Sequence, residues 1–114
     1  MGGWGYTPKV GKVYVVALTT SWAQVLTAAQ AKATRGYMVK TRQSFDVDGS
    51  PSHAPCPFDL AFTSSPSSGA DSDGTGFYSF SGVGSGQVLG PSNGLYARTS
   101  VAVGTVLLEI IVFE

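Results

Sequence analysis

The sequence predicts an all-β protein, an antiparallel β-sandwich or jelly roll of about eight short strands. In several segments apolar and polar residues alternate with a period of two, as they do in half-buried strands. Glycine, proline and aspartate separate these segments, and hardly any stretch follows the 3.6-residue period of a helix. An open barrel is the second possibility.

We expect two parts, an extended N-terminal arm over residues 1–11 and a single sandwich domain over residues 12–114. The arm contains four glycines, one proline, Trp4 and Tyr6, a composition that does not favour regular structure but supplies two large rings. A chain of 114 residues is long enough for one hydrophobic core.

The first half of the domain reads as three strands. Residues 12–18 are apolar on both faces, which predicts a central strand. Residues 21–26 predict a second strand, and residues 27–34 predict a turn or loop because so short an alanine-rich segment is not a stable helix alone. Residues 35–43 predict a half-exposed strand with Tyr37, Val39 and Thr41 on one face.

The second half predicts shorter strands and a distinctive end. Residues 58–63 alternate, with Phe58, Leu60 and Phe62 facing inward, and short strands follow at residues 77–81 and 87–89. Residues 94–114 predict two strands that meet at Gly104. The last strand has one wholly apolar face and a second face on which Leu107, Ile111 and Phe113 stand beside Glu109. That second face is covered either by the chain itself or by another chain.

The charge balance argues against nucleic-acid and membrane partners. Seven basic and seven acidic residues give a net charge of zero, and charged residues are 12% of the chain against about 25% in average proteins. Low charge favours association, so we expect a homo-oligomer. The sequence shows no signal peptide or membrane span, and Cys56 is the single cysteine, so we expect synthesis in the cytoplasm and no internal disulfide.

The candidate metal ligands do not form a recognisable site. Two D-x-D-G strings carry Asp46 and Asp48 and then Asp71 and Asp73, but neither fits the EF-hand register. We interpret both as turns, and a cation that joins the two loops is the alternative. His53 and Cys56 supply two zinc ligands where four are needed. We therefore expect no metal and no cofactor.

No catalytic arrangement is evident, so we expect a protein that is not an enzyme. The chain has one histidine and no G-x-S-x-G string, and its G-V-G-S-G string at residues 82–86 lacks the lysine of a phosphate loop. Arg35, Lys40 and Arg42 form a short basic row, which we interpret as the solvated face of an edge strand. Trp4, Trp22 and Tyr96 form either a sugar-stacking platform or part of the core.

Four strings give the chain a resemblance to a known family. VVALTTSWAQVL and RGYMVKTRQ in the first half, then GLYARTSVAVG and TVLLEIIVFE at the end, resemble the layout of small β-sandwich virion proteins of tailed bacteriophages. The resemblance covers most of residues 12–47 and 86–114. It implies a capsid decoration or cement protein, located in the virion, that is usually an oligomer and binds the major capsid protein at junctions between capsomers.

Together these observations predict a non-enzymatic virion structural protein that stabilises the phage head. The residues expected to bind the partner are Trp4, Tyr6, Leu107, Ile111 and Phe113. The alternative is a tail, adaptor or fibre component, or a carbohydrate-binding sandwich module.

Overall fold

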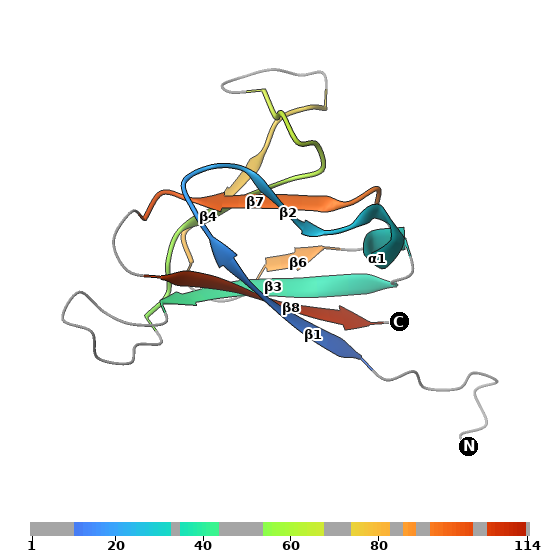
Figure 1. Cartoon of the computed structure of the whole chain (residues 1–114), viewed down its shortest axis with the longest axis horizontal. Helices are drawn as coiled ribbons and strands as arrows, with labels where there is room; N and C mark the ends of the chain where they lie inside the picture. The colour runs from blue at the N-terminus through green and yellow to red at the C-terminus, as the bar shows by residue number, and fades with distance from the viewer. Residues whose placement is uncertain are drawn as a thin grey trace.

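The computed structural model describes residues 11–32, 35–43, 54–67, 74–82, 86–88, 92–101 and 105–113. These residues form eight strands and one short helix, arranged as two packed sheets (Figure 1). The elements are β1 (Lys12–Leu18), β2 (Ala23–Leu26), α1 (Ala28–Lys32), β3 (Gly36–Gln43), β4 (Phe58–Ala61), β5 (Tyr78–Phe80), β6 (Gly86–Val88), β7 (Leu95–Thr99) and β8 (Val106–Phe113). The predicted all-β sandwich is confirmed.

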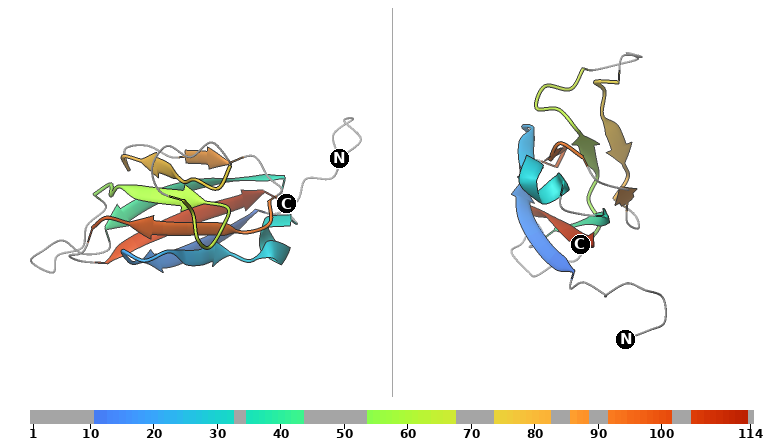
Figure 2. Two further views of the ribbon diagram at one scale, coloured as in Figure 1. Left: turned by 90° about the horizontal axis from the view of Figure 1, so that it is seen from above. Right: turned by 90° about the vertical axis from the view of Figure 1, so that its right-hand side faces the viewer.

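The strand order is that of a jelly roll. One sheet has the order β1-β8-β3-β6 and the other β2-β7-β4-β5, and every pairing is antiparallel. The pairs β1·β8, β2·β7, β3·β6 and β4·β5 are nested inside one another along the chain. Such nesting is produced when a long antiparallel ribbon is wrapped into two layers, which the right-hand view of Figure 2 shows from one end.

The core lies between the two layers and is built by strand alternation. Val106, Leu108, Ile110 and Val112 of β8 are all buried, as their spacing predicts. Tyr37 and Val39 of β3 enter the same core from the neighbouring strand. The opposite sheet contributes Phe58, Leu60, Leu95 and Ala97. Thr41 and Thr99 are buried as well, although their side chains are polar.

The positions of β1 and β3 correct two predictions. β1 is an edge strand of its sheet, whereas its two apolar faces had predicted a central one. β3 lies between β8 and β6, so the basic row that was assigned to an edge strand stands on a central strand. Both errors have one physical cause, because the neighbours of a strand in a sheet are set by distant segments and not by its own residues.

The other differences lie at the ends of strands. β4 ends at Ala61, so Phe62, which was expected to face inward, is 58% exposed while Ala61 is buried. β7 and β8 follow each other in the chain but belong to different sheets, so the two terminal strands do not pair with each other.

Residues 27–34 contain a single helical turn, in agreement with the predicted turn. The Thr27 hydroxyl accepts a bond from the Gln30 amide at 3.2 Å, and the Gln30 side-chain oxygen accepts one from the Thr27 amide at 2.9 Å. This reciprocal capping box satisfies two backbone donors at the start of α1. It explains why five residues form a helix at one end of the sandwich (Figure 1).

Several predicted features lie outside the described residues. They are the arm over residues 1–10 with Trp4 and Tyr6, the aspartates at 46, 48, 71 and 73, His53, and Gly104. Among the described residues no helix is both long and apolar enough to cross a bilayer.

Candidate functional site

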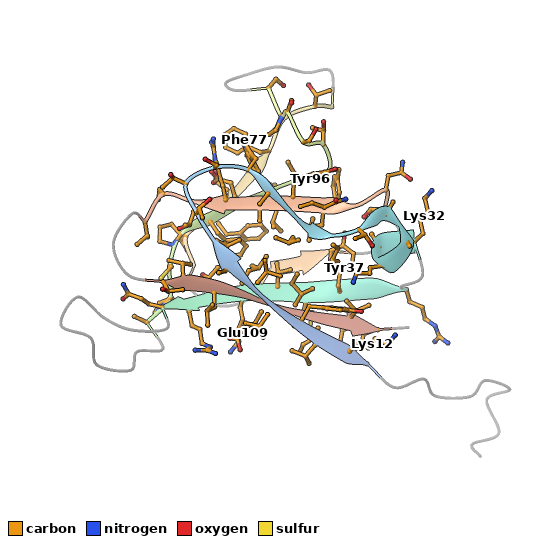
Figure 3. All side chains as sticks on the ribbon, in the orientation of Figure 1. Lys12, Lys32, Tyr37, Phe77, Tyr96 and Glu109 are labelled. Atoms are coloured by element: carbon orange, nitrogen blue, oxygen red, sulfur yellow. The ribbon has the colours of Figure 1, made fainter. Side chains whose placement is uncertain are left out.

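The face of β1, β8 and β3 that points away from the second sheet is the candidate functional surface, here called the outer face. Figure 3 shows Glu109 of β8 on this side of its sheet and Tyr37 of β3 between the two layers. Strand alternation and register place ten side chains on the outer face: Val13, Val15, Ala17, Met38, Lys40, Arg42, Leu107, Glu109, Ile111 and Phe113.

The outer face is unusually apolar for a surface without a covering layer. Val13 is 64% exposed, Val15 51%, Ile111 41% and Phe113 46%. The register sets Val13 and Met38 on either side of Ile111, so three apolar side chains form one row across the sheet. Because a contiguous exposed apolar patch marks an interaction site, this row is the candidate contact region.

A small hollow lies beside Met38 and Ile111 of this row. It has a volume of about 140 Å³ and a mainly apolar lining made by Met38, Val39, Lys40, Glu109 and Ile111. A hollow of this size admits one protruding side chain but no cofactor or drug-sized ligand, whose sites usually measure about 300–1,000 Å³. The size and apolar lining of the hollow therefore suit contact with a side chain of another protein better than binding of a small-molecule substrate.

One carboxylate lies at the centre of the outer face. Glu109 Oε2 lies 3.3 Å from Arg42 Nε, and Glu109 Oε1 lies 3.5 Å from Lys40 Nζ. Oε1 is covered and accepts no hydrogen bond of good geometry, so the contact with Lys40 is ionic only. The two cations and the carboxylate leave one net positive charge here, and the rest of the face is neutral.

The outer face of the other sheet carries a polar and aromatic cluster. The Arg98 guanidinium lies 4.6 Å from the ring centre of Trp22 and 4.7 Å from that of Phe77. Its Nε donates to Asp59 at 2.8 Å, and the Ser79 hydroxyl donates to the same carboxylate at 2.7 Å. The charges and hydrogen-bonding groups of this cluster are therefore paired with one another. Trp22 is therefore occupied by contacts within the chain rather than held open as a platform.

Among the described residues, the histidine, cysteine and acidic side chains that could ligate a metal ion are Cys56, Asp59 and Glu109. No group of three or more histidine, cysteine, aspartate or glutamate side chains gathers among them. Burial raises the pKa of the Cys56 thiol, which disfavours the reactive thiolate. Burial also raises the pKa of Tyr37, and its hydroxyl contact with Ser92 at 3.0 Å opposes that change.

The structure brings together three of the five residues predicted to bind a partner. Leu107, Ile111 and Phe113 share the outer face, with Leu107 half-buried, while Trp4 and Tyr6 lie outside the described residues. The site prediction omitted Val13, Val15 and Met38. The signal for Val13 and Val15 was present, because β1 has two apolar faces and any strand of a two-layer sandwich, whether edge or central, buries only one face in its own core.

Comparisons with known proteins add no family. No protein-family model, no curated protein and no solved structure matches this chain.

Proposed function

We propose that this chain is a non-enzymatic structural protein of a tailed bacteriophage, a decoration or cement protein that binds the major capsid protein and stabilises the head. The outer face of β1, β8 and β3 makes the contact. Trp4 and Tyr6, predicted from the sequence to bind the same partner, belong to the proposal as well.

The exposed apolar row of the outer face carries the proposal. Burying Val13 and Ile111 of this row, together with Phe113 further along β8, removes apolar area from water and contributes roughly 25 cal/mol per Å². Many copies on one particle multiply a modest affinity for each contact. The jelly-roll order adds support, because this architecture recurs in viral capsid proteins.

Co-sedimentation with phage heads tests the proposal. Purified chain is mixed with heads that lack it, and occupancy is measured as the amount of chain that pellets with the particles. We expect Ile111→Ser to lower occupancy by about tenfold or more, because it removes an apolar anchor from the centre of the row. The fold is preserved because this side chain is 41% exposed.

Phe62→Ser is the matched control, since Phe62 is 58% exposed but follows β4 in the other sheet. It should leave occupancy unchanged. Occupancy that responds equally to both variants, or to neither, would contradict the proposal.

A carbohydrate-binding module is the alternative that the sequence leaves open, although Trp22 and Asp59 are both paired with Arg98 within the chain. Saturable binding of glycans by the isolated chain, with no binding to heads, would establish that candidate instead.

A further inference from the structure

The four sheet edges of this sandwich differ in how well they are protected from pairing with another strand. β5 and β6 are edges of three residues each, and β2 has four residues with a register shift between Gln24 and Leu26. Short or irregular edges are the devices by which native sandwiches prevent sheet extension. Three of the four edges formed by the described residues therefore carry such a device.

β1 carries none of these devices. It is seven residues long, contains no proline, and pairs with β8 without a register shift from Lys12 to Leu18. Lys12 is its only charged residue and stands at its first position. A long, regular edge strand with so little charge is a template for one more strand.

We propose that β1 pairs antiparallel with β1 of a second copy of this chain, which joins the two β1-β8-β3-β6 sheets into one continuous sheet across a two-fold axis. A two-fold contact uses the same surface on both copies, so each residue of the strand meets its symmetry-related position. The register that pairs all seven residues places the axis at Val15.

The side chains of β1 are complementary to themselves in that register. On the outer face Val15 stands opposite Val15 of the partner subunit, and Val13 stands opposite Ala17 of the partner subunit. On the other face Tyr14 stands opposite the partner's Val16. Every one of these is an apolar cross-strand pair, of the kind that stabilises antiparallel sheets. The two copies of Lys12 lie at opposite ends of the contact and do not repel each other.

The dimer also enlarges the proposed contact surface. Val13 and Val15 lie beside Ile111 and Glu109 in the register of β1 and β8, so both outer faces become contiguous at the axis. The inference does not depend on capsid binding, because it concerns the free protein in solution.

Sedimentation equilibrium of the purified full chain tests the proposal. We expect the mass of two chains at micromolar concentration. Val15→Lys places two like charges opposite each other at the axis and should raise the dimer dissociation constant by about a hundredfold or more. The single chain tolerates this change, because Val15 is 51% exposed and Glu109 stands opposite it on β8.

Tyr78→Lys is the matched control. Tyr78 is 69% exposed and lies on β5, an edge of the other sheet, so this variant should remain a dimer. A chain that is monomeric at all concentrations would overturn the proposal, and so would an oligomer that Val15→Lys leaves intact. Circular dichroism of each variant confirms that the sandwich has formed.

A cross-linking experiment tests the register directly. Residues that face each other across antiparallel strands have Cα atoms about 4.5–5.5 Å apart, which a disulfide can span. Val15→Cys should therefore give a covalent dimer on mild oxidation or with a short thiol cross-linker, and Tyr78→Cys should not. A dimer in which Val15→Cys gives no covalent product would rule out pairing through β1, whatever the outcome with phage heads.

Discussion

Gly82 shows how a single residue allows two segments to approach closely. It is buried with a φ of 93°, in the left-handed region that favours glycine. A Cβ atom at this position would lie 2.2 Å from the carbonyl oxygen of Cys56 and 2.4 Å from its carbonyl carbon. Because the obstructing atoms are backbone, the segment before β4 would have to move to admit any side chain.

We expect Gly82→Ala to lower the free energy of unfolding by roughly 2–4 kcal/mol, through backbone strain and the clash with Cys56. The shift of the urea unfolding midpoint measures this loss. Gly76→Ala is the control, because a Cβ atom at Gly76 meets nothing within 4 Å. Its effect should stay within about 0.5 kcal/mol. Equal losses in the two variants would show that the close approach at Gly82 does not matter.

At the scale of elements, two threonines from opposite sheets fix the segment that leads into β4. The hydroxyl of Thr41 on β3 bonds the Cys56 carbonyl and accepts from the Cys56 amide at 3.3 Å. The hydroxyl of Thr99 on β7 donates to the Pro57 carbonyl at 2.8 Å and accepts from the Val101 amide at 3.1 Å. These bonds explain why two threonine side chains are buried beside an apolar core.

Thr99→Val keeps the shape of the side chain but leaves the Pro57 carbonyl and the Val101 amide without a partner. We expect a loss of about 1–3 kcal/mol in the free energy of unfolding, which chemical denaturation measures. Thr63→Val is the control, because Thr63 is only half-buried and its bond with Ser65 is exposed. The control should change stability by less than about 0.5 kcal/mol. A neutral Thr99→Val would show that water or relaxation satisfies these groups.

How far the sequence predicted an element depended on whether the signal was local. Alternation alone assigned the inner and outer faces of β3 and β8, since side-chain direction follows a period of two. That is why Leu107, Ile111 and Phe113 were correctly grouped on one face. It did not predict that β1 is an edge strand, because Val13 and Val15 look the same in a central strand.

At the scale of the whole molecule, the nested pairing of strands explains why the sequence did not predict which strands lie side by side. The first described strand pairs with the last, so Lys12 lies opposite Val112. The sequence of either strand does not indicate which distant strand it pairs with. The ion pairs of Glu109 with Lys40 and Arg42 likewise join segments that are far apart in the chain. The basic row was visible in the sequence, but the carboxylate that pairs with two of its members became evident only in the fold.

The same nesting predicts slow folding. The pairs β1·β8 and β3·β8 must close long loops before their contacts become favourable, and chains dominated by such contacts fold in about milliseconds to seconds. Stopped-flow fluorescence of a Trp4→Phe variant reports on Trp22 alone, which lies against the Arg98 guanidinium and meets the Phe77 ring edge to face only in the folded sandwich. Refolding within about 0.1 ms would contradict this expectation. Repeating the measurement in Val15→Lys separates folding from association, because only the association phase should depend on protein concentration and disappear in that variant.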